Sequence, residues 1–122
     1  MTNLQGTEKQ IEYANKIMED VLTTYTKIET LLNTVEMPEE LRTLFLTPVT
    51  ESKALVLKLV KADRVISAFK DIVYLKTNAK KVKFILNKIN CQRFQPANGF
   101  DGKVVGNQRT KDLENNVEEY FI

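Results

Sequence analysis

Lysine is the residue type whose spacing in this chain most clearly allows chemistry. The stretch KTNAKKVKFILNKIN, residues 76–90, holds five lysines and no acidic residue, with apolar residues between the charges. Lysine ammonium groups attract phosphates and carboxylates as point charges. The stretch is therefore either an anion-binding surface or the solvated side of a helix.

Catalytic and metal-binding chemistry finds little support in the other residues. The chain has no histidine, the commonest general base, and its single cysteine, Cys91, cannot form a thiolate zinc site. Adjacent carboxylates such as Glu39 and Glu40 diverge by about 100° on a helix. No glycine-rich phosphate loop occurs. We expect no enzymatic activity, no metal and no cofactor.

Charge is distributed unevenly along the chain, although the formal net charge is only +2. Lys and Arg counted against Asp and Glu give −5 for residues 1–51, +9 for 52–93 and −2 for 94–122. The acidic and basic parts can neutralise each other within the fold or can face different partners. The candidate anion-binding or partner-binding residues are Lys53, Lys61, Arg64, Lys76, Lys80, Lys83, Lys88 and Arg93.

Apolar periodicity predicts that helices carry these groups. Thr7 and Gln10 match a capping box, and apolar residues from 11 to 35 recur at spacings of three and four. Pro38 suits the start of a short helix around residues 41–46, which Pro48 is expected to end. A second long helix then begins at Thr50 or Ser52. Its core positions are Leu55, Leu59, Ala62, Ile66, Phe69 and Val73.

The lysine-rich stretch is expected to form a third helix that Thr77 or Asn78 caps. Its apolar face carries Ala79, Val82, Ile85, Leu86 and Ile89. A hairpin turning through residues 77–80 is the alternative, because apolar and polar residues also alternate there as in a strand. Ala, Lys and Leu favour the helix. The aromatic residues are expected to pack in the core: Tyr13, Tyr25, Phe69, Tyr74 and Phe84.

These elements predict an all-α fold, a small helical bundle with two long antiparallel amphipathic helices, a short connecting helix and the basic third helix. Residues 1–93 form the bundle. Residues 94–122, with three of the four glycines, form a loop-rich tail of the same domain, with a short terminal helix near Thr110, Leu113, Val117 and Phe121. We expect a cytoplasmic protein without a membrane partner, because no apolar run spans a bilayer and the start lacks signal-peptide order.

The opening LQGTEKQIEYANKI resembles an N-terminal motif of small, mostly uncharacterised proteins of Gram-positive bacteria, their phages and mobile elements. AKKVKFILNKIN is similar to a second motif of these proteins, in which Asn87 and Lys88 match the polar end. This chain lacks the tryptophans that such proteins often carry, and has Tyr13 and Ile85 or Leu86 in their place. The residues that match the first motif are Gly6, Thr7, Gln10, Ile11, Tyr13, Ala14 and Ile17.

Two functional hypotheses follow. The resemblance, the missing catalytic groups and the two charged parts favour a non-enzymatic interaction protein of a phage or mobile element. It would bind and modulate a host protein or ribonucleoprotein complex that handles nucleic acid, inhibition of host defence being one form of this. The alternative is an accessory protein that binds DNA or RNA directly through the lysine-rich helices of residues 52–93.

Overall fold

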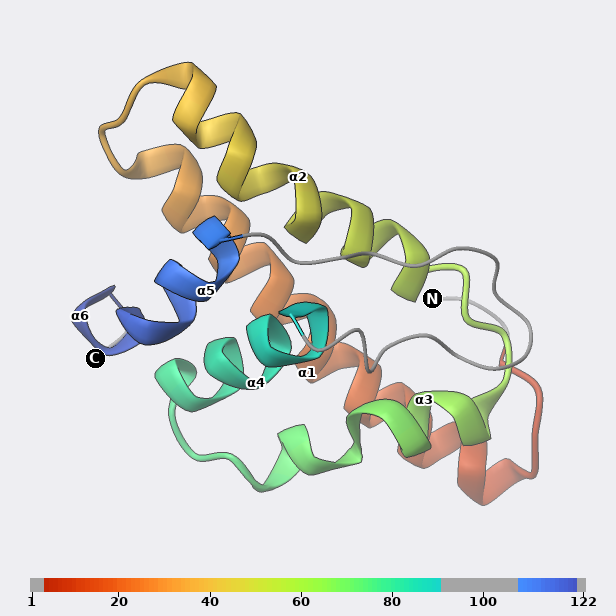
Figure 1. Ribbon diagram of the computed structural model, residues 1–122. Coiled ribbons are helices and arrows are strands. Elements are labelled where there is room, and N and C mark those ends of the chain that lie inside the picture. Colours follow the sequence, from red (N-terminus) through yellow and green to blue (C-terminus); the bar gives the residue numbers. More distant parts are fainter. Residues whose placement is uncertain (1–3, 91–107, 121–122) are drawn as a thin grey trace.

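The computed structural model describes residues 4–90 and 108–120, and these form helices that pack against one another (Figure 1). Within these ranges there is no strand beyond a single parallel bridge between Gln5 and Lys61. The expected all-α bundle is confirmed. The elements in chain order are α1 (Glu8–Thr34), α2 (Glu39–Val56), α3 (Ala62–Phe69), the 3₁₀ helix η1 (Lys70–Tyr74), α4 (Asn78–Asn90), α5 (Gln108–Asn115) and α6 (Val117–Tyr120).

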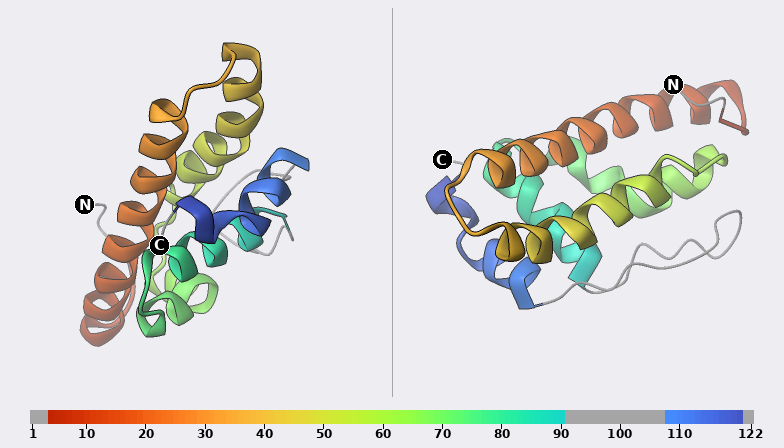
Figure 2. Two further views of the ribbon diagram at one scale, coloured as in Figure 1. Left: turned by 90° about the vertical axis from the view of Figure 1, so that its left-hand side faces the viewer. Right: turned by 90° about the horizontal axis from the view of Figure 1, so that it is seen from above.

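Helix α1 is the central element of the bundle. It runs along the length of the molecule, and α2 returns antiparallel beside it (Figures 1 and 2). Helices α3 and α4 and η1 also pack against α1. The predicted spacing of three and four places one side of α1 in the core, with these residues buried: Ala14, Ile17, Met18, Val21, Tyr25, Ile28 and Leu32.

The first sequence motif joins the start of α1 to the start of α3. The predicted capping box is present, since Thr7 Oγ1 accepts from the Gln10 amide at 3.2 Å and the Thr7 amide donates to Gln10 Oε1 at 3.0 Å. Gly6 has φ +155°, and a Cβ there would lie 3.2 Å from Ala62 Cβ. The Ala62 amide donates to the Gln5 carbonyl at 2.8 Å. Glycine is therefore required where these segments meet.

The expectation that Pro48 ends a short helix is wrong, because α2 continues through it. A proline inside a helix costs about 3 kcal/mol. Burying Val49 and Val56 on the same helix gains about 1.5–3 kcal/mol each, which is enough to offset this. The Thr47 hydroxyl also donates to the Thr43 carbonyl at 2.7 Å in the turn before the proline. Tertiary packing thus overrides the local signal.

The expected second long helix over residues 52–73 is also wrong. The chain leaves the helix after Val56 and begins α3 only at Ala62, because the amide of Ala62 and the carbonyl of Val60 bond to Gln5 instead of within a helix. After Phe69 the chain tightens into η1. The predicted core positions in this region are nevertheless buried or half-buried. The long antiparallel partner of α1 is therefore α2.

Helix α4 confirms the predicted third helix and rules out a hairpin through residues 77–80. Thr77 Oγ1 accepts from the Lys80 amide at 3.2 Å, as expected of a cap. Val82, Ile85, Leu86 and Ile89 are buried. Helices α5 and α6 pack against α4, with Thr110, Leu113 and Val117 buried at this contact. The expected loop of residues 94–107 and Phe121 lie outside the described residues.

Candidate partner-binding surface on α4

Part of the basic charge is neutralised inside the bundle. Lys53 Nζ on α2 lies 2.8 Å from Glu29 Oε1 on α1, and Lys81 Nζ on α4 lies 3.3 Å from Asp20 Oδ1 on α1. All four side chains are partly buried. The acidic first helix therefore takes up some of the charge of the middle segment. Lys53, a candidate binding residue in the sequence, holds α2 to α1 instead.

Two further candidates belong to a different part of the surface. Lys61 precedes α3, bridges to Gln5 and is half-buried, and Arg64 is half-buried in the first turn of α3. Figure 1 shows the start of α3 at the end of the molecule away from α5 and α6. Arg93 lies outside the described residues. The eight candidate residues therefore do not form one continuous surface.

Three of the candidates lie on α4 or directly before it, and we call them the α4 lysine face: Lys76, Lys80 and Lys83. Lys80 and Lys83 lie one turn apart on the same side of α4, and Lys76 lies in the segment that leads into the helix. All three are exposed, and none forms an ion pair with another of the described residues. This face carries concentrated positive charge toward solvent.

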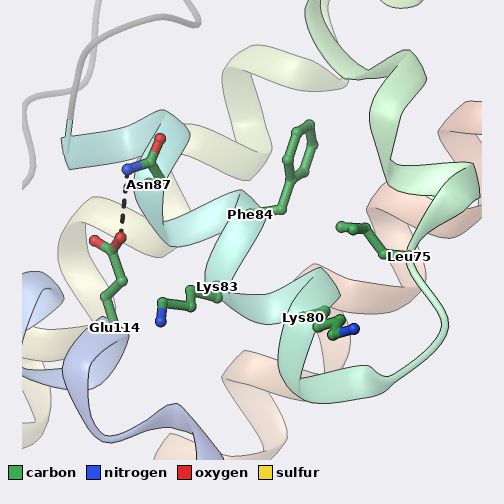
Figure 3. Close-up of a pocket in the computed structure, with 6 residues that line it drawn as sticks. All are labelled: Leu75, Lys80, Lys83, Phe84, Asn87 and Glu114. Carbon is green, nitrogen blue, oxygen red and sulfur yellow. Dashed lines mark hydrogen bonds between the residues drawn. The ribbon is translucent and has the colours of Figure 1, made fainter.

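An open pocket of about 370 Å³ adjoins the α4 lysine face. Figure 3 shows Phe84 and Leu75 on one side of it and Asn87 and Glu114 on the other, with Lys83 and Lys80 on the helix below Phe84. The pocket therefore combines an apolar wall with cationic and polar groups. Its lining residues are Leu75, Lys80, Lys83, Phe84, Asn87 and Glu114.

Asn87 and Asn90 hold α5 against α4 through one carboxylate. Asn87 Nδ2 donates to Glu114 Oε1 at 3.3 Å, and Asn90 Nδ2 donates to Glu114 Oε2 at 2.8 Å. Asn87 matches the polar end of the second motif, and in this structure its side chain joins α4 to α5. Glu114 was not among the predicted site residues. It lies 24 residues after Asn90, and no sequence pattern over such a separation indicates that the two residues are in contact.

The aromatic residues divide between the core and this surface. Tyr25 and Phe69 are buried as expected, and Tyr25 shares a hydrogen bond with the Ser52 hydroxyl. Burial raises the pKa of Tyr25 well above its ordinary value. The expectation for Tyr74 is wrong, since its side chain is 68% exposed. Its place in η1 turns it outward instead of along a helix stripe.

Phe84 and Tyr13 are only half-buried at the edge of the core. Lys88 Nζ lies over the Phe84 ring, 5.1 Å from its centre, as in a cation–π contact. A hydrogen bond with Tyr74 raises the pKa of Tyr13. Phe84 is therefore the aromatic residue among those that line the pocket. The apolar periodicity of the sequence predicted only a packing role for it.

Clusters of metal-ligating side chains and membrane-spanning helices are both absent from the described residues. Over residues 4–90 and 108–120, no three His, Cys, Asp or Glu side chains gather as metal ligands. In the same ranges, no helix has both the length and the apolar character needed to cross a membrane.

Comparisons with known proteins find no relationship for this chain. No family model matches it, and no curated protein and no solved structure matches it. Arguments about function therefore depend on the residues and the geometry of the chain itself.

Proposed function

We propose that this is a non-enzymatic interaction protein of a phage or mobile element, which binds and modulates a host protein complex that handles nucleic acid. Inhibition of a host defence complex is one form that this modulation would take, and it would occur in the host cytoplasm. The observation that carries the proposal is the α4 lysine face, with three exposed ammonium groups, two of which, those of Lys80 and Lys83, border a pocket that has an apolar wall. The resemblance of the opening motif supports the genetic origin.

The surface has the composition of a protein-binding site. Interfaces generally combine an apolar centre with a polar rim, and charge complementarity sets the encounter rate and the choice of partner. Here Phe84 and Leu75 supply apolar area, and Lys80 and Lys83 supply the charged rim. A partner with an acidic surface would meet both features at once.

The proposal is tested by capture from a Gram-positive host with the wild-type chain and the variant K80E/K83E, both in nuclease-treated lysate. Lys80 and Lys83 are exposed, so the substitutions should leave the fold intact. We expect a specific nucleic-acid-handling protein to be recovered by the wild-type chain and lost with the variant. The matched control K9E/K16E changes two exposed lysines of α1 by the same charge and should retain the partner. Recovery of no specific protein would reject the proposal.

Direct binding to DNA or RNA is the second candidate, because two exposed lysines beside an aromatic residue are also typical of phosphate and base contacts. Fluorescence anisotropy with labelled single-stranded and double-stranded DNA and RNA at several salt concentrations tests it. Micromolar binding with a steep inverse salt dependence, abolished in K76E/K80E/K83E, would support direct binding. Absence of nucleic-acid binding at low salt would exclude this second candidate and leave binding to a protein partner as the proposed function.

A further inference from the structure

We infer that the occupant of the pocket beside the α4 lysine face is an acidic peptide segment of the partner, with a large apolar side chain anchored against Phe84 and Leu75. The inference deepens the proposed function and rests on it. It assigns the partner's contact to a short acidic and apolar stretch of polypeptide instead of a nucleic acid.

The size and composition of the pocket fit a side-chain anchor. It is an open pocket of about 370 Å³, and Phe84 and Leu75 form its apolar wall. Lys80 and Lys83 border the same space and can pair with carboxylates on either side of the anchor (Figure 3). Anchoring of an aromatic or long aliphatic residue is how a few side chains come to dominate an interface.

The surroundings of Phe84 disfavour a stacked base. One face of the ring lies under the Lys88 ammonium, 5.1 Å from the ring centre, and the side chain also packs against the core. Stacking of a base needs a free aromatic face, whereas an apolar side chain can pack against the edge of the ring. The ring as it stands therefore suits an aliphatic or aromatic side chain better than a nucleotide.

The charges around the pocket also favour a peptide. Glu114 stands in the wall opposite Phe84, and its carboxylate disfavours any anion next to it, so this part of the pocket suits the uncharged anchor and the backbone of a peptide while the acidic side chains pair with Lys80 and Lys83. The carboxylate already accepts from Asn87 and Asn90 and has capacity for further donors, such as the backbone N–H groups of a peptide. Lys80 and Lys83 lie only about 4.5 Å apart along the helix axis, and the nearby Lys81 is engaged by Asp20. Such a face offers a phosphate backbone only a short run of cations.

The test is a titration of the full chain with three labelled probes. One is a short glutamate-rich peptide with a central tryptophan, the second is the same peptide with serine in place of tryptophan, and the third is a single-stranded DNA of equal charge. We expect the tryptophan peptide to bind at least about tenfold more tightly than the other two. Equal binding of the two peptides, tighter binding of the DNA, or no binding of either peptide would each overturn the inference.

Variants locate the binding on the surface. K80E/K83E should weaken the tryptophan peptide at least about tenfold, and K9E/K16E should leave its affinity unchanged. Phe84→Leu, with the fold checked by circular dichroism, should reduce the preference for tryptophan over serine. An unchanged preference would overturn the inference.

If capture of a host protein depends on Lys80 and Lys83 but no acidic peptide binds, the proposed function stands and this inference fails. If the peptide binds and no host protein is captured, the proposed function fails and the pocket assignment stands.

Discussion

At the scale of single residues, the close approach of Gly6 to Ala62 leaves little room for a side chain at position 6. Gly6→Ala would place a methyl group 3.2 Å from Ala62 Cβ and 2.9 Å from Gln10 Oε1, at φ +155°. We expect a loss of about 1–3 kcal/mol in the free energy of unfolding, because the backbone is strained and the neighbours must move. Urea denaturation measures it. Gln5→Ala is the control, since Gln5 is exposed and pairs through its backbone. Equal stabilities of the two variants would contradict this role of Gly6.

Tyr25 should make the stability fall in alkali. Burial raises the pKa of Tyr25 in the folded chain. The folded chain therefore keeps the phenol protonated at pH values above about 10, where the tyrosine of the unfolded chain loses its proton. Stability should therefore decrease as the pH rises from 9 to 11, by up to about 1.4 kcal/mol per pH unit above 10. Tyr25→Phe should reduce this decrease, whereas Ser52→Ala, which keeps the buried phenol, should retain it. Denaturant titrations at several pH values measure both, and the same pH dependence in Tyr25→Phe would refute the assignment.

At the scale of elements, the carboxylate of Glu114 on α5 accepts hydrogen bonds from two amide groups of α4. Glu114→Ala removes the acceptor of Asn87 and Asn90, and should cost about 1–3 kcal/mol because the amide groups lose their partner. Hydrogen exchange should accelerate in α5 and remain slow in α1, whose contacts do not involve Glu114. Glu119→Ala on the exposed side of α6 is the control. Unchanged exchange in α5 would show that the Glu114 hydrogen bonds do not hold this helix.

The sequence predicted the elements that depend on interactions between residues close in sequence, and it missed those that depend on contacts between distant residues. The cap at Thr7, the stripe of α1 and the helix at residues 78–90 depend on neighbours three or four residues away, and they were predicted. The continuation through Pro48 and the break at residues 57–61 depend on contacts with α1 and Gln5, and they were missed. The pocket was missed for the same reason, since Glu114 reaches α4 from a separate segment.

At the scale of the molecule, the small net charge of +2 conceals two different uses of lysine. Lys53 and Lys81 tie α2 and α4 to the acidic helix α1. The lysines at 76, 80 and 83 remain exposed, and those at 80 and 83 border a pocket with an apolar wall. The lysines of the stretch at residues 76–90 therefore differ in role: Lys81 holds α4 to α1, and we propose that Lys76, Lys80 and Lys83 bind the partner.

Lysine footprinting of the captured complex tests that claim most directly. The chain is acetylated with and without its partner, and the modification of each lysine is compared by mass spectrometry. We predict that Lys76, Lys80 and Lys83 lose reactivity in the complex, while Lys9 and Lys16 on the exposed side of α1 keep it. Full reactivity of the three α4 lysines in the complex, or protection confined to α1, would contradict the account.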